Sequence, residues 1–252
     1  MIYREKRIKA GEFLEVEIYP ITPLERSKSR KRKLKESRKE QKNLNDKNAK
    51  KKLRRLINHN FTERDLVVHL TYTDKTLPTS EDEAKKDVKN FIRRVKRKRQ
   101  KAGLPEVKYI AVFEYVNYDP QNKDKRKKVR MHHHIIMSAM DRDELEKLWD
   151  KGRCNADRLQ ADEKGFESLA NYISKNPKGS KRYSRSKNIV EPEIQINDSK
   201  WTRRKVMQVS QCPEDRELFE KLYPGWTFTQ CSVEVNEINA GFYIELKMRG
   251  TG

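Results

Sequence analysis

The apolar residues of this chain fall into short runs, which limits the folds available to it. The longest run, "YIAVF" at 109–113, has the length of a single strand. "DLVVHLTYTD" (65–74) and "EVKYIAVFEYV" (106–116) are short and rich in β-branched residues, as is typical of buried strands. Helical patterns separate some of these runs, and others follow one another across a loop. We therefore expect an α+β fold with a central antiparallel sheet flanked by helices.

A helical pattern occupies the segment between the first two of these strands. It begins at Ser80, which forms a capping box with Glu83, and it ends at Gly103. Its apolar stripe consists of Ala84, Val88, Phe91, Ile92 and Val95. The opposite face is almost entirely Lys and Arg. This pattern predicts a helix that packs on the sheet with one side and presents positive charge on the other.

The chain is strongly basic, with a net charge of +21 from 59 Lys and Arg against 38 Asp and Glu. Between Arg26 and Arg55, sixteen basic residues accompany three acidic ones, and neither Pro nor Gly occurs. This composition favours a long N-terminal basic helix, with a solvated basic arm as the alternative. The excess of positive charge favours a polyanionic partner, and nucleic acid is the first candidate.

Several classes of protein are not indicated by this sequence. No apolar stretch approaches the roughly 18 residues of a membrane-spanning helix, and the N-terminus lacks the apolar region of a signal peptide. We therefore expect no membrane partner. Cys154, Cys212 and Cys231 are odd in number and lack C-x-x-C spacing, so neither a disulfide framework nor a structural zinc site is predicted. A reducing interior suits them.

Three histidines stand in a row inside the apolar segment "VRMHHHIIMSAM" at 129–140. Side chains alternate along a strand, so His132 and His134 should share one face and His133 the other. Their Cβ atoms would be roughly 6.5–7 Å apart, and two imidazoles at that spacing can converge on one metal ion. Glu114 interrupts an apolar strand and would lie beside the pair if the two strands form a hairpin. Packing roles for these histidines remain the alternative.

A second candidate cluster lies in "LANYISKN". Tyr172 and Lys175 are three residues apart, and on a helix they would share a face. Nearby positive charge helps a phenol to ionise, which makes a tyrosine beside a lysine a candidate nucleophile. By itself this spacing is weak, because most tyrosines at a helix edge are packing residues.

Taken in order, Glu114, His132, His134, Tyr172 and Lys175 resemble the motifs of the HUH endonucleases. The resemblance is to rolling-circle replication initiators of small phages and plasmids, of the single-tyrosine type. "LRRLINHNFTERDLVVHLTYTD" looks like the family's first motif, although His69 stands where Thr is expected. We interpret His69 as a residue on the sheet face. "NYISKNPKGSKRYSRSKNIVEP" looks like the stretch at and after the nucleophile, and the likeness extends over roughly residues 40–195.

The resemblance implies a sheet of the kind found in RNA-recognition domains and the nicking of single-stranded origin DNA, often in a hairpin. Glu114, His132 and His134 would hold Mn²⁺ or Mg²⁺, with Zn²⁺ as an alternative. Tyr172 would form a 5′-phosphotyrosine link and release a 3′-hydroxyl primer, supported by Lys175. A host helicase and DNA polymerase would be partners, because the 252 residues contain no G-x-x-x-x-G-K-[ST] motif. The location would be the cytoplasm of a bacterial host, and the oligomeric state stays open.

The expected organisation has three parts. Residues 1–62 would form N-terminal strands and a basic helix, residues 63–200 the endonuclease core, and residues 201–252 a β-rich extension of the same domain. The basic residues expected to contact DNA are Arg30, Lys31, Arg32, Lys51, Arg54, Arg55, Arg94, Lys96, Arg97, Lys181, Arg182 and Arg185. The competing functions are an HUH relaxase, a single-tyrosine transposase, and a nucleic-acid-binding protein without catalysis.

Overall fold

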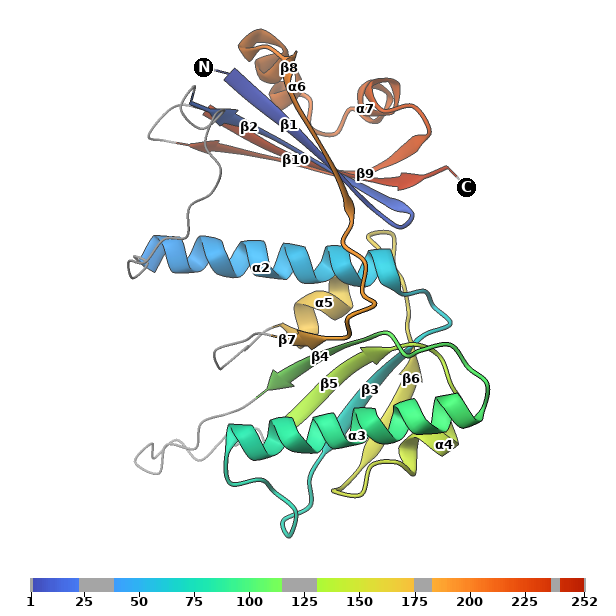
Figure 1. Cartoon of the computed structure of the whole chain (residues 1–252). Coiled ribbons are helices and arrows are strands. Elements are labelled where there is room, and N and C mark those ends of the chain that lie inside the picture. Colours follow the sequence, from blue (N-terminus) through green and yellow to red (C-terminus); the bar gives the residue numbers. More distant parts are fainter. Residues whose placement is uncertain (1, 23–38, 115–130, 175–182, 237–240, 252) are drawn as a thin grey trace. The chain divides into compact units, whose positions relative to one another are not determined.

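The computed structural model describes residues 2–22, 39–114, 131–174, 183–236 and 241–251 (Figure 1). Within these ranges, only the backbone is described for residues 39–44, 114 and 236. The chain divides into two compact units. We call residues 1–59, 162–165 and 191–252 the terminal unit, and residues 60–161 and 166–190 the central unit. Each contains one five-stranded antiparallel sheet with helices, so the predicted α+β class is confirmed.

The central unit is built on a sheet with the strand order β6-β3-β5-β4-β7. Its strands are β3 (Leu66–Thr71), β4 (Tyr109–Glu114), β5 (His132–Met137), β6 (Cys154–Arg158) and β7 (Tyr183–Arg185). Its helices are α3 (Glu81–Lys101), α4 (Arg142–Glu146) and α5 (Glu167–Ile173). The histidine strand β5 is therefore central, between β3 and β4, and β4 pairs with it as the predicted hairpin partner.

Helix α3 begins and ends as its sequence predicts. The Ser80 side chain accepts a hydrogen bond from the Glu83 backbone N–H, and Glu83 in turn accepts from the backbone N–H of Thr79. The predicted apolar stripe is buried and packs with Leu66, Val68 and other residues on one face of the sheet. Figure 1 shows α3 lying across that face. The other face of the sheet is thus left for the histidines that point away from α3.

The terminal unit has the strand order β8-β1-β2-β10-β9. Its strands are β1 (Ile2–Ala10), β2 (Phe13–Ile21), β8 (Glu193–Trp201), β9 (Trp226–Asn236) and β10 (Gly241–Gly250). Its helices are α2 (Lys39–Asn60, whose last residue belongs to the central unit), α6 (Arg203–Gln211) and α7 (Arg216–Leu222). The β1–β2 turn uses Gly11, which has φ 63° and a backbone carbonyl, that of Asn58, against its Cα. Both conditions require glycine there.

The two ends of the chain build this sheet together. Strand β10 pairs with β2 over Ile244↔Ile18 to Arg249↔Phe13, and β8 pairs with β1. The shared core includes Val16 and Leu246 on one face of the sheet and Val206 and Phe219 from α6 and α7. Residues 201–252 therefore complete a sheet with residues 2–21. They do not lengthen the sheet that carries the histidines.

The helices were also searched for membrane spans. Within the described ranges, no helix is both long enough and apolar enough to cross a bilayer.

Candidate active site on the central sheet

The pairing of β5 sorts its three histidines between the two faces of the sheet. His133 lies opposite Leu70 and Phe113, whose side chains belong to the core beneath α3. It is buried there, and its Nε2 lies 2.9 Å from the Tyr72 hydroxyl. Burial lowers the pKa of His133 to about 3, so the ring is neutral at physiological pH. His133 is therefore a packing residue, as strand alternation predicts.

His132 and His134 lie together on the opposite face. Their ring centroids are 4.9 Å apart and their planes are nearly perpendicular, at 82°. His134 is 1% exposed, whereas His132 is half-buried at the edge of the site. Burial lowers the pKa of His134 to about 3, with a smaller contribution from the neighbouring histidines. The neutral imidazole is the form that metal ions bind.

Tyr172 projects from α5 toward this pair. Its ring lies edge-on to His134, with 5.4 Å between the ring centroids, and 51% of the residue is exposed to solvent. The helix is held in place by Ala170 and Ile173, which are buried, and by the Ser174 hydroxyl, which donates to the Ala170 carbonyl at 2.6 Å. A phenol held beside two imidazoles, and open to solvent, can reach a ligand that binds on this face.

His69 is a further member of the site. It lies directly opposite His134 in the β3–β5 pairing. Its ring centroid is 4.6 Å from that of His134 and 6.4 Å from that of Tyr172. Burial lowers the pKa of His69 as well. The only sequence signal was its place on the face away from Leu66, Val68 and Leu70, because contact with His134 depends on a register that a single strand does not reveal.

Two of the expected site residues are only partly accessible to description. Register places Glu114 directly opposite His132, on the strand next to it, but its side chain lies outside the described part. Lys175 also lies outside the described residues. Among the side chains that are described, no three His, Cys, Asp or Glu form a group that could hold a metal ion. The described donors thus number two neutral imidazoles, which suit a divalent ion but need a third ligand.

The expected DNA contacts fall into three sets. Arg30, Lys31, Arg32, Lys181 and Arg182 lie outside the described residues. Arg94, Lys96, Arg97 and Arg185 belong to the central unit: Arg94 pairs with Asp150 at 2.9 Å and Lys96 with Glu106 at 2.9 Å, whereas Arg97 and Arg185 are exposed. The remaining three, Lys51, Arg54 and Arg55, lie on α2 in the terminal unit.

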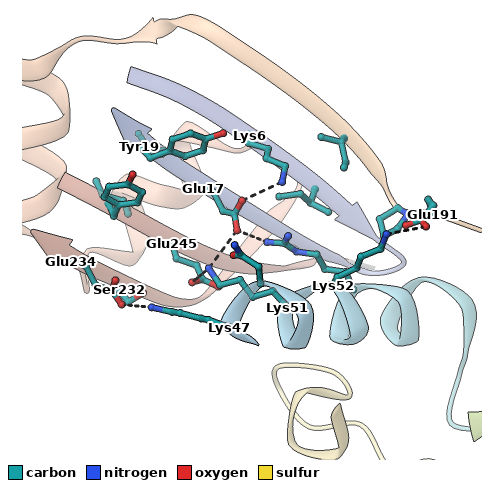
Figure 2. A pocket seen from close by; sticks show the side chains of 18 of the residues that line it. Lys6, Glu17, Tyr19, Lys47, Lys51, Lys52, Glu191, Ser232, Glu234 and Glu245 are labelled. Atoms are coloured by element: carbon teal, nitrogen blue, oxygen red, sulfur yellow. Dashed lines mark hydrogen bonds and ion pairs between the residues drawn. The ribbon is translucent and has the colours of Figure 1, made fainter. Parts of the chain in front are cut away.

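The basic residues of α2 are engaged with the sheet of their own unit. Arg54 and Arg55 contact Glu15 at 2.8 and 2.7 Å, and Lys51 contacts Glu245 at 2.5 Å. A cavity of about 820 Å³ lies beside them, and both signs of charge line it (Figure 2). The charges that line it form the pairs Lys6–Glu17, Lys47–Glu234 and Lys52–Glu191. Because these cations already have acidic partners, the region does not present the net positive surface that phosphates require.

Comparison with known protein families gives one match. Residues 65–177 match the family of the replication-associated protein ORF2. The matched segment begins just before β3, ends just after α5, and includes Glu114, His132, His134, Tyr172 and Lys175. No curated protein and no solved structure gives a significant match. The central unit is thus similar to replication-associated proteins, and the terminal unit is almost entirely outside the match.

Proposed function

We propose that this chain initiates rolling-circle replication by nicking single-stranded origin DNA, with Tyr172 as the nucleophile. One observation carries the proposal: Tyr172 is exposed and lies edge-on to His134, which shares a sheet face with His132. The match of the same segment to replication-associated proteins supports the role in replication. The excess of positive charge suits a DNA substrate.

His132 and His134 would hold a divalent ion, with Glu114 as the third ligand from the paired position on β4. Burial keeps His134 uncharged, so a nitrogen lone pair is available without the loss of a proton. Carboxylate and imidazole donors together suit Mn²⁺ or Mg²⁺, with Zn²⁺ as an alternative. When bound, such an ion supplies Lewis acidity toward a phosphate oxygen and offsets charge that develops during transfer.

Tyr172 would attack the scissile phosphorus in line with the bond that breaks. A bond forms between the phenolic oxygen and phosphorus, and the bond from phosphorus to the 3′-oxygen breaks. The phenol loses its proton, and the leaving 3′-oxygen gains one. The products are a 5′-phosphotyrosine link and a free 3′-hydroxyl that can prime synthesis. One phosphodiester replaces another, so the step is reversible and the strand can be rejoined without ATP.

The test is formation of a covalent protein–DNA adduct. The full chain is incubated with single-stranded or hairpin origin DNA and Mn²⁺, and the adduct is detected on a denaturing gel. Wild type should give the adduct, Tyr172→Phe should give none, and His132→Ala and His134→Ala should lose it while salt-sensitive DNA binding persists. An adduct that survives Tyr172→Phe would refute the role of Tyr172. If wild type binds DNA and forms no adduct, a non-catalytic nucleic-acid-binding protein becomes the better description.

A further inference from the structure

Four basic residues of α3 form a row along the side of the helix that faces away from the sheet. Lys89, Arg93, Arg97 and Lys101 follow one another at intervals of four residues, and all four are exposed. Four residues make slightly more than one turn, so each residue is displaced by only about 40° from the one before. The row lies directly opposite the buried stripe that contains Val88, Phe91, Ile92 and Val95.

The row differs in its partners from four other cations of the same helix. Those four have acidic partners, in the pairs Lys85–Glu81, Arg94–Asp150, Lys96–Glu106 and Lys98–Glu144. Within the described part of the chain, none of the four row residues forms an ion pair; Arg93 donates to the Asn90 side chain. The row therefore carries positive charge that its own unit does not neutralise.

The position of α3 separates this charge from the candidate active site. The helix packs on the sheet face that carries Leu66, Val68 and His133, whereas His134 and Tyr172 meet on the other face. The row is further away still, on the outer side of a helix about 10–12 Å across. Nucleotides bound at Tyr172 cannot also lie on the row, so it would contact a different part of a DNA molecule.

The shape of the row suits a stiff, regular polyanion. Twelve residues of helix place Lys89 and Lys101 about 18 Å apart along the axis. Double-stranded DNA presents one charge for roughly every 1.7 Å of its axis, so several phosphates face a row of that length. Surfaces that bind single strands add aromatic side chains on which bases stack. The sole aromatic residue of α3 is Phe91, which is buried.

We propose that Lys89, Arg93, Arg97 and Lys101 bind the phosphate backbone of duplex DNA, such as the double-stranded flank or stem beside the nicked single strand. The choice of DNA as the polyanion rests on the proposed function, whereas the charge row and its position do not. The two surfaces would then divide the substrate: the histidine face takes the single strand, and α3 takes the adjoining duplex.

The test measures binding of a 20-base-pair duplex by fluorescence anisotropy across a range of salt concentrations. Arg93→Gln/Arg97→Gln should reduce the magnitude of the log–log salt slope by about 1.8, since each phosphate contact contributes about 0.9. The matched control is Lys85→Gln/Lys98→Gln, which removes the same net charge from ion-paired positions of α3 and should leave the slope close to wild type. Arg93→Lys/Arg97→Lys keeps both charges and should keep the slope, which guards against a folding defect.

Two results would overturn the proposal. Equal slope changes in the glutamine variant and its matched control would mean that only the net charge matters. A slope change on a single strand of the same length, with none on the duplex, would mean that the row binds single strands. Failure of the proposed function is a separate result, because it appears as the absence of a covalent adduct with wild type while duplex binding by the row persists.

Discussion

Both units place a long helix beside a five-stranded sheet, but the chemistry of the two contacts is opposite. Helix α3 contacts the central sheet through Val88, Phe91 and Val95, which are buried among apolar strand residues. Helix α2 contacts the terminal sheet through ion pairs from Lys51, Arg54 and Arg55 to acidic residues of β2 and β10. Figure 2 shows part of this charged layer, with Lys51 over Glu17 and Glu245.

The comparison shows two ways of fixing a helix on a sheet. Apolar burial is not directional and adds stability roughly in proportion to the area that is removed from water. Buried ion pairs gain little net stability, because the desolvation of both charges offsets their attraction, yet the loss of one partner is costly. We therefore expect the α3 contact to respond to changes in side-chain volume and the α2 contact to respond to changes in charge.

The largest effect should come from the apolar contact. Phe91 is fully buried, and its ring centroid is 5.7 Å from that of Trp149. Phe91→Ala should lower the free energy of unfolding of the central unit by about 3–5 kcal/mol, from lost burial and the cavity that remains. Chemical denaturation followed by hydrogen exchange in β3 and β5 measures this. Lys89→Ala, on the exposed side of the same helix, should change it by less than about 0.5 kcal/mol.

The next effect tests the charged contact. Glu15 is 3% exposed and contacts both Arg54 and Arg55, so Glu15→Ala leaves two guanidinium groups short of a partner. We expect a loss of about 3 kcal/mol in the terminal unit, read from hydrogen exchange in β2 and β10. In the double variant Glu15→Leu/Arg54→Met, apolar side chains replace one ion pair and most of that loss should be recovered. A double variant as unstable as Glu15→Ala would argue that the ion pair itself stabilises the fold.

A smaller effect should appear on acidification. The cations around Glu17, chiefly Arg55, hold its pKa at about 2 against an ordinary 4.5, even though burial acts in the opposite sense. Because the folded state has the lower pKa, Glu17 contributes its full stability above pH 4.5, and this is lost as the pH falls toward 2. The loss in the terminal unit should be roughly 2 kcal/mol, from the pKa difference discounted for partial exposure. In Glu17→Gln, the acid-dependent loss over the same pH range should be correspondingly smaller.

The smallest effect belongs to the rim of the same layer. Lys47 and Glu234 form a contact of 2.7 Å, but both side chains are more than half exposed. Exposed pairs contribute about 0.2–1 kcal/mol at most, so Lys47→Ala should change the melting temperature of the terminal unit very little. A large change would show that α2 depends on its exposed pairs as much as on those that are buried.

Local patterns predicted a good part of the candidate site. Alternation along one strand is enough to place His132 and His134 together and His133 apart. The capping residues and apolar stripe likewise predict the α3 helix, and the structure places it at Glu81–Lys101. The contact of His69 with His134 could not be predicted in this way, because it depends on how two strands far apart in the sequence are aligned. The partners of Arg54 and Arg55 were also hidden, since the sequence shows their charge but not the carboxylates that fold against them.

The sequence by itself determined the fold class, the orientation of the histidines within their strand, and the excess of basic residues. Each of these depends on residue types and on spacings within one element, which the period of a helix or strand makes readable. Only the tertiary structure decided that the two ends of the chain form one sheet, that Tyr172 lies beside His134, and which cations of α3 have acidic partners. These features arise from contacts between segments far apart in the chain, where competing pairings are separated by packing energies that no local pattern encodes.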